Sequence, residues 1–201
     1  MLFGSVLLTP MALTEPFFVP TYWRPDSILN HPKLSVEDFI FCFAIGGIIA
    51  ICYEFVMGSA LDHYRLHRTI RYVFFQLLFL LSGGIILFVF YLILRLEFIY
   101  ATYLFAITEI SIFTVLRRDL LRKIIYSGII FGTFYSTVYI VFSILFPIRF
   151  VHMWNIRDLS GIFVLGMPLE EIVWAFLIGA VAAPFYELIF SLELKKHSVD
   201  S

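Results

Sequence analysis

The sequence predicts an all-α integral membrane protein, a bundle of five to six transmembrane helices. Hydrophobic residues make up 61% of the 201-residue chain, and its mean hydropathy is +0.95. A single soluble core of this size cannot bury so much apolar surface, so the bilayer must act as solvent for part of it. Several apolar runs also reach the length of about 18 residues that crosses a bilayer as a helix.

Each apolar run predicts a helix, because a segment in lipid has to satisfy its own backbone hydrogen bonds. The chain begins with residues 1–13, an apolar segment that lacks the basic start of a signal peptide and is expected to be a short membrane segment. The longer runs follow at residues 39–57, 73–94, 98–116, 124–146 and 171–190. Their connections are short, and none resembles a soluble domain.

The number and distribution of charged residues restrict which partners the chain can bind and how it is oriented in the membrane. The chain carries 14 Lys and Arg against 15 Asp and Glu, so no basic face is available to bind nucleic acid. The positive-inside rule places the connections richer in Lys and Arg, around residues 58–72 and 117–123, in the cytoplasm. We therefore expect a multi-pass protein of the cell membrane whose partners are membrane lipid and a lipid-soluble molecule. A single chain and a homodimer both fit this pattern.

The chain also repeats itself. Residues 35–54 align with residues 168–187, and the matched positions pair Glu37 with Glu170, Gly46 with Gly179 and Glu54 with Glu187. A tryptophan precedes each copy by a similar gap, Trp23 before the first and Trp154 before the second. Both copies are expected to cross the membrane in the same direction. This predicts one membrane domain made of two parallel three-helix repeats, about residues 1–94 and 98–194, with a site between them.

An acidic pair opens each copy of the repeat. The pairs are Glu37 with Asp38 and Glu170 with Glu171. One interpretation is structural: Ser35 and Asp38 fit a capping box, and Pro168 suits the first position of a helix whose dipole favours nearby negative charge. The recurrence of the pair in both copies, each before an aromatic-rich helix, favours a catalytic role.

Such a pair at a membrane boundary suits the protonation of a polyene. A polyene has no polar handle, so acid–base attack on it means protonating a terminal double bond to give a carbocation. A carboxyl keeps its proton at neutral pH when lipid and a second carboxylate disfavour its charge, and aromatic faces stabilise the cation by about 0.5–2 kcal/mol each. The predicted substrate-binding residues, for which packing is the alternative role, are Tyr22, Trp23, Phe39, Phe41, Trp154 and Trp174, with Glu109 in the middle of its run.

The other polar residues of the apolar runs and loops give weaker indications of function. Glu54 and Glu187 lie near the cytoplasmic ends of their helices, where pairing with Arg or Lys would satisfy them. His63 and His67 have the spacing of two metal ligands on one helical face, but a solvated loop explains them better, and no metal is expected. No phosphate loop or dinucleotide fingerprint occurs, so no cofactor is expected.

Four strings carry a resemblance to a known family: GMPLEEIVWAF at 166–176, HMWN at 152–155, EPFFVPTYW at 15–23 and SVEDFIFCFAIGG at 35–47. With them the chain resembles the lycopene cyclase domain family over most of its length. The resemblance implies a small membrane enzyme, of fused or heterodimeric type, that cyclises the ends of lycopene or a related carotenoid without net redox change, an isomerase or intramolecular lyase. It also implies that the proton-donating carboxylates follow Pro168, at Glu170 and Glu171, and more loosely at Glu37 and Asp38. The first copy departs from the motif at Ser35 and Val36, and both C40 and C50 polyenes fit as substrate.

Two further functions compete with this interpretation. An intramembrane protease with paired glutamates would need an arginine shortly after the pair, where this chain has Ile172 and Val173. A non-enzymatic carrier or scaffold for a lipid-soluble small molecule is the stronger alternative. A carrier predicts acidic residues along a hydrated route near the midplane, whereas a cyclase predicts them at the mouth of a dry aromatic cleft.

Overall fold

The computed structural model describes residues 1–19, 21–24, 28, 34–57, 64–65, 83–87, 89–147, 152–190 and 192–193. These residues are mostly helical, in agreement with the predicted all-α class. Much of the predicted span 73–94 and of the loop 58–72 lies outside the described residues, as do His63 and His67.

The N-terminal half begins with a broken helix. Its pieces are α1 (Leu2–Leu8), the 3-10 helix η1 (Thr9–Thr14) and α2 (Glu15–Phe18). Pro10 and Pro16 lie in the first turns of η1 and α2, where a residue without a backbone N–H is tolerated but a continuous α-helix is interrupted. The next helix, α3 (Val36–Met57), begins three residues before the predicted run.

The C-terminal half holds the longest helices, α5 (Phe98–Leu116) and α6 (Leu121–Leu145), joined by the 3-10 turn η3 (Arg118–Leu120). In the described part of the chain, the helical stretches Phe98–Leu116 and Arg118–Leu145 are long and apolar enough to cross a membrane. The predicted helix 171–190 begins earlier and is divided into α8 (Leu169–Ala182) and α9 (Phe185–Phe190). Pro184 lies at the break, since proline cannot continue the ladder of helical hydrogen bonds.

Shorter elements connect these helices. A π-helical turn, η2 (Val89–Ile93), precedes α5, and a 3-10 turn, η4 (Ile156–Asp158), follows α6. The strands β2 (Phe163–Val164) and β3 (Met167–Pro168) form a hairpin directly before α8, while β1 (Tyr64–Arg65) pairs with β4 (Leu192–Glu193). The hairpin turns at Leu165 and Gly166, both with positive φ, as a two-residue turn between twisted strands requires.

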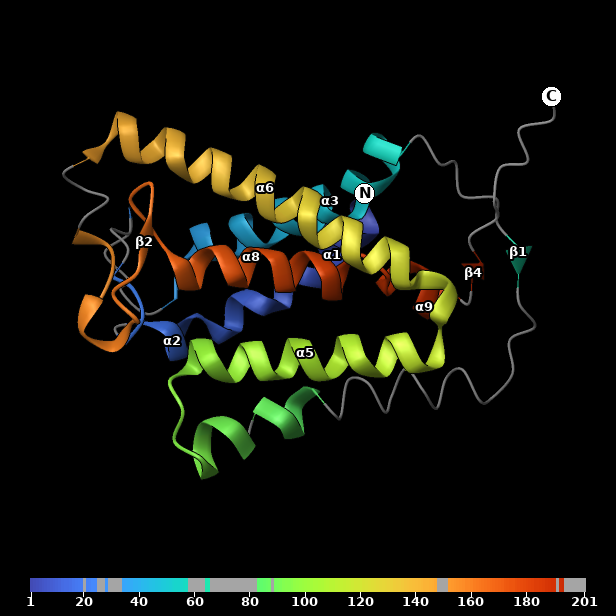
Figure 1. The fold of residues 1–201 in the computed structure, drawn as a ribbon, viewed down its shortest axis with the longest axis horizontal. Helices are drawn as coiled ribbons and strands as arrows, with labels where there is room; N and C mark the ends of the chain where they lie inside the picture. Colours follow the sequence, from blue (N-terminus) through green and yellow to red (C-terminus); the bar gives the residue numbers. More distant parts are fainter. Residues whose placement is uncertain are drawn as a thin grey trace.

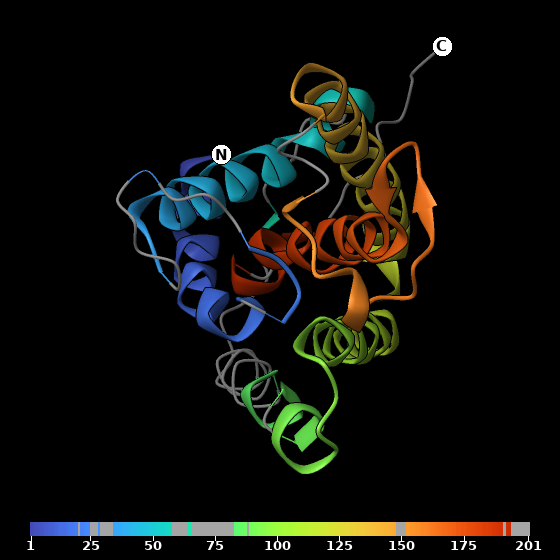
Figure 2. The same ribbon diagram turned by 90° about the vertical axis from the view of Figure 1, so that its left-hand side faces the viewer.

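The helices lie side by side, with α1 and α6 running in one direction and α3, α5 and α8 in the other (Figure 1). Viewed from the end where the hairpin lies, α8 occupies the centre of the bundle, with the other helices around it (Figure 2). Glycines permit the closest approaches. A methyl group added at Gly46 would come within 2.3 Å of the Gly4 carbonyl oxygen, and one added at Gly179 within 2.9 Å of Phe131 Cβ. Gly46 of α3 therefore packs closely against α1, and Gly179 of α8 against α6.

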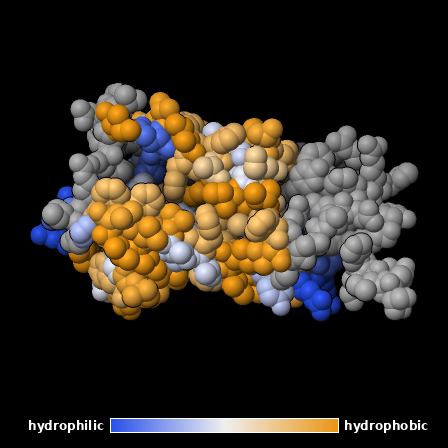
Figure 3. Space-filling model, turned by 90° about the horizontal axis from the view of Figure 1, so that it is seen from above, coloured by the Kyte–Doolittle hydropathy of each residue, from blue (hydrophilic) through white to orange (hydrophobic). Residues whose placement is uncertain are grey.

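The outer faces of the bundle are apolar. Hydrophobic residues cover most of the coloured surface in Figure 3, and hydrophilic residues gather near the ends of that surface. Exposed apolar side chains on the two longest helices include Ile107, Val115, Ile125, Ile129 and Val141. Contiguous apolar surface of this kind is unfavourable in water and is the surface that a bilayer solvates. The chain thus has the surface of a membrane protein.

Candidate active site

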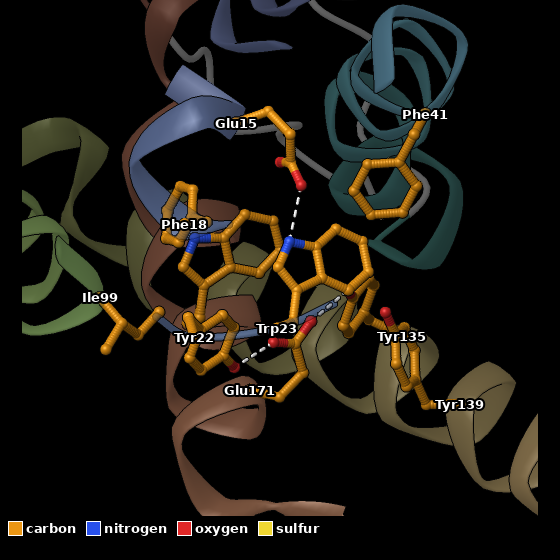
Figure 4. A pocket seen from close by; sticks show the side chains of 10 residues that line it. Glu15, Phe18, Tyr22, Trp23, Phe41, Ile99, Tyr135, Tyr139 and Glu171 are labelled. Carbon is orange, nitrogen blue, oxygen red and sulfur yellow. Dashed lines mark hydrogen bonds between the residues drawn. The ribbon is translucent and has the colours of Figure 1, made fainter. Parts of the chain in front are cut away.

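A pocket lies at the end of the bundle where α8 begins, and Figure 4 shows the side chains that line it. Its cavity volume is about 50 Å³, and the wider space between the lining side chains, which includes open solvent, is about 370 Å³. Its lining comes from α2, the loop after α2, α3, α5, α6 and α8, and consists of Glu15, Phe18, Tyr22, Trp23, Phe41, Ile99, Tyr135, Tyr139, Glu171 and Trp174. Most of these side chains are aromatic, and two are carboxyls. The pocket is therefore an aromatic cavity with acidic groups in its wall.

Of the two carboxyls, Glu171 accepts more hydrogen bonds from neighbouring side chains. It lies in the first turn of α8 and is only 6% exposed. Tyr135 of α6 donates its phenol hydrogen to Oε1 at 2.5 Å, and Tyr22 donates to Oε2. Burial, with the neighbouring Glu171, raises the pKa of the Tyr22 phenol, so Tyr22 stays an O–H donor. Both oxygens of Glu171 are thus held by phenols from different segments.

Glu170 points elsewhere, although it is adjacent in sequence. Its Oε1 accepts hydrogen bonds from the Ser160 amide at 2.5 Å and from the Tyr100 phenol at 3.2 Å, and its carbonyl oxygen accepts one from Tyr103 at 2.5 Å. Consecutive helix residues project in different directions, so two adjacent glutamates do not share a face. Glu170 joins α8 to α5 and to the loop after η4, and Glu171 is the member of the predicted pair that lines the pocket.

The acidic pair of the first copy lies at the start of α3. Asp38 accepts hydrogen bonds from the amide of Ser35 at 2.6 Å and from its hydroxyl at 3.0 Å, which confirms the predicted capping interaction. Glu37 accepts one from the Ile28 amide at 2.8 Å. Neither carboxyl is among the lining residues, and a catalytic role for Glu37 and Asp38 stays a prediction.

Four of the six predicted aromatic residues line the pocket: Tyr22, Trp23, Phe41 and Trp174. The indole of Trp154 packs behind them, 5.3 Å from the ring of Tyr22 and 6.2 Å from that of Trp23. Trp23 and Trp154 also form an antiparallel β-bridge, which joins the two loops that carry them. Phe39, on α3, is half-buried and outside the lining.

Sequence reasoning missed several lining residues, of which Glu15, Tyr135 and Tyr139 are polar. Glu15 follows the apolar segment 1–13 and accepts a hydrogen bond from the Trp23 indole N–H at 2.6 Å. Tyr135 and Tyr139 are four residues apart on α6, with ring centroids 4.7 Å apart. Two phenols at helical spacing inside an apolar run are the signal that could have indicated this face of α6.

Two other acidic residues of the apolar runs, Glu109 and Glu187, are not among the residues that line the pocket. Glu109 is fully buried on α5. Glu187 forms a buried ion pair with Lys123 of α6, which confirms that a basic residue satisfies it. The side chain of Glu54 lies outside the described residues.

One family model matches part of the chain. Residues 97–189 match the family model described as lycopene cyclase. This part of the chain is a lycopene cyclase domain. The domain extends from the start of α5 into α9 and contributes Tyr135, Glu171 and Trp174 to the pocket, whereas Glu15 and Trp23 precede it. No curated protein and no solved structure matches the chain.

Proposed function

We propose that the protein is a carotenoid end-group cyclase, which protonates a terminal double bond of a linear polyene and closes a ring through a carbocation. The observation that carries this proposal is a carboxyl, Glu171, in the wall of an aromatic pocket within the lycopene cyclase domain. The reaction is an isomerisation, because one proton enters the substrate and one leaves it. It therefore requires no redox cofactor.

The lining supplies what this chemistry needs. Addition of a proton to the terminal double bond leaves a tertiary cation, and the electron pair of a nearby double bond closes the ring and moves the cation into it. Loss of a ring proton to a carboxylate then gives the neutral product. Aromatic faces such as those of Trp174 and Trp23 stabilise the cation by about 0.5–2 kcal/mol each and contain no nucleophile that would trap it.

The position of the carboxyls supports a cyclase over a carrier. Glu15 and Glu171 belong to an aromatic cavity at the end of the bundle, as expected for a cyclase. The apolar flanks of the helices suit delivery of a polyene from the bilayer. A multi-pass topology in the cell membrane, with the end that bears Lys123 in the cytoplasm, completes the proposal.

Two parallel repeats are part of the same proposal. The pair α1 and α3 resembles the pair α6 and α8 in direction, in its close glycine contact and in the tryptophan-bearing loop that joins its helices. The pocket then lies where the two repeats meet, because each contributes one tryptophan loop to that end of the bundle.

The test is expression of the chain in a bacterium that accumulates lycopene, with the extracted pigments separated by chromatography and identified by their absorption spectra. We expect a cyclised pigment from the wild type and its loss in Glu171→Gln, which keeps the shape of the side chain but cannot carry the proton. The matched control is Glu97→Gln, since Glu97 lies outside the pocket and makes no capping hydrogen bond. Unchanged lycopene in cells that contain the inserted wild-type protein would refute the proposal for this substrate.

A further inference from the structure

The pocket contains a second carboxyl that the lycopene cyclase match does not include. Glu15 belongs to α2, and its side chain lies across the Trp23 ring from Glu171 (Figure 4). The two carboxyls differ in their hydrogen bonds. Glu171 accepts two, from Tyr22 and Tyr135, whereas in the described part of the chain the side chain of Glu15 is bonded by Trp23.

We propose that Glu15 is a catalytic residue of the cyclisation, the acid that delivers the proton to the terminal double bond, and that Glu171 is the base that removes a proton from the ring cation. This assignment rests on the proposed cyclase function. It divides the two proton transfers between two groups in one pocket.

The hydrogen bonds favour this division. Each oxygen of Glu171 receives an O–H donor, from Tyr135 or Tyr22, and these hydrogen bonds favour its ionised form against the opposing effect of its burial. The Trp23 indole N–H is bonded to Oε1 of Glu15, which leaves Oε2 to carry a proton. When two carboxyls in one site have environments that separate their proton affinities, their roles as acid and base separate as well.

The charges around Glu15 also favour its role as the acid, because they favour its protonated form. Among the described residues, the titratable groups that act on Glu15 or feel its charge are Asp38 and Cys42 on α3, Tyr139 on α6 and Glu171 on α8, and none of these is basic. Burial above all, and then the neighbouring acidic groups, raises the pKa of Glu15 to about 7, against the opposing effect of the Trp23 hydrogen bond. Glu15 therefore still holds a proton near neutral pH, as a general acid must.

The proton balance closes over one turnover. Glu15 loses its proton to the less substituted carbon of the terminal double bond and becomes a carboxylate, a carbon–carbon bond forms at the resulting tertiary cation as the ring closes, and Glu171 gains the proton that leaves the ring. Transfer of that proton from Glu171 back to Glu15, directly or through solvent, restores the starting state. No electrons are gained or lost, and no co-reactant is needed.

The experiment measures the initial rate of ring formation against pH in membranes that contain the full chain and lycopene. For the wild type the rate should fall as the pH rises through about 7, because Glu15 then loses its proton. Glu15→Gln should lower the rate by about 10²–10⁴-fold, the usual contribution of a general acid, and Glu15→Asp should restore part of it. Glu97→Gln serves as the control for a glutamate outside the pocket.

A second variant separates a catalytic Glu15 from one that only orients Trp23. Trp23→Phe keeps a ring in the wall but removes the N–H that favours the ionised carboxyl, so the fall in rate should move to higher pH. A purely structural Glu15 predicts a lower rate with the pH profile unmoved, and that result would overturn the assignment, as would a wild-type rate in Glu15→Gln. If the wild type forms no ring at any pH, the cyclase function itself fails.

Discussion

The phenol of Tyr135 offers a direct test of how the pocket holds Glu171. Its hydroxyl donates to Oε1 at 2.5 Å, and the residue is only 5% exposed. Tyr135→Phe removes this hydrogen bond and the contact of the same hydroxyl with the Tyr139 hydroxyl, while the ring keeps its place between Tyr139, at 4.7 Å, and Trp174, at 5.7 Å. The substitution therefore changes the support of the carboxyl without opening a cavity.

The expected effect follows from the charge on the acceptor. A hydrogen bond to a charged group contributes about 1.5–3 kcal/mol. If the bond positions the carboxylate as the ring proton leaves, its loss lowers the rate of ring formation by about 10- to 150-fold, since each 1.36 kcal/mol of barrier is tenfold in rate. The assay is pigment conversion in membranes, normalised to the amount of inserted protein.

The same helix provides the control. Tyr126 is also on α6 but is 44% exposed and lies outside the pocket, so Tyr126→Phe should leave the rate unchanged. Equal rates for the two variants would refute the role given to the phenol. They would show that Glu171 acts without the Tyr135 hydrogen bond, or that it is not the base.

Two further predictions concern groups outside the pocket. Glu170→Gln should preserve ring formation, because the amide oxygen of glutamine can still accept a hydrogen bond from the Ser160 amide. Glu171→Gln, measured side by side, should lose it. Loss of activity in both variants would show that the two glutamates act together. Lys123→Met should destabilise the protein by about 3–5 kcal/mol because it leaves Glu187 buried without its cation, whereas the Lys123→Met, Glu187→Met double variant should recover most of that stability. Thermal unfolding in detergent tests this, and equal losses in the single and double variants would contradict it.

Several elements could be predicted from the sequence because the signal is local. The run 98–116 coincides with α5, since apolar residues fill the helix and Arg117 follows its end. The capping of α3 by Ser35 and Asp38 is local as well. The split between α8 and α9 was predictable in principle, because Pro184 lies inside the run, but hydropathy alone does not register the missing backbone N–H.

The composition of the pocket could be predicted only in part, because it depends on helix phase and on distant contacts. The sequence identifies Glu170 and Glu171 as a pair, but only the packing of α8 decides which of them faces the cavity. Tyr22 and Glu171 meet although 149 residues separate them in the chain. Glu15 was overlooked for a similar reason. In the sequence it stands next to Pro16 after an apolar segment, as a residue between two helices does. Its place in the pocket depends on the loop that carries Trp23, whose indole N–H donates a hydrogen bond to it.

The two halves of the chain contribute different parts of the proposed chemistry. The lycopene cyclase domain holds Glu171 with Tyr135 and Trp174, while the segment before it holds Glu15 with Tyr22 and Trp23. The β-bridge between Trp23 and Trp154 and the Tyr22 hydrogen bond to Glu171 join these sets at the end of the bundle. A reaction that needs one group to give a proton and another to take it therefore needs both halves folded together, and the bridge between the tryptophan loops is one of the contacts that join those halves.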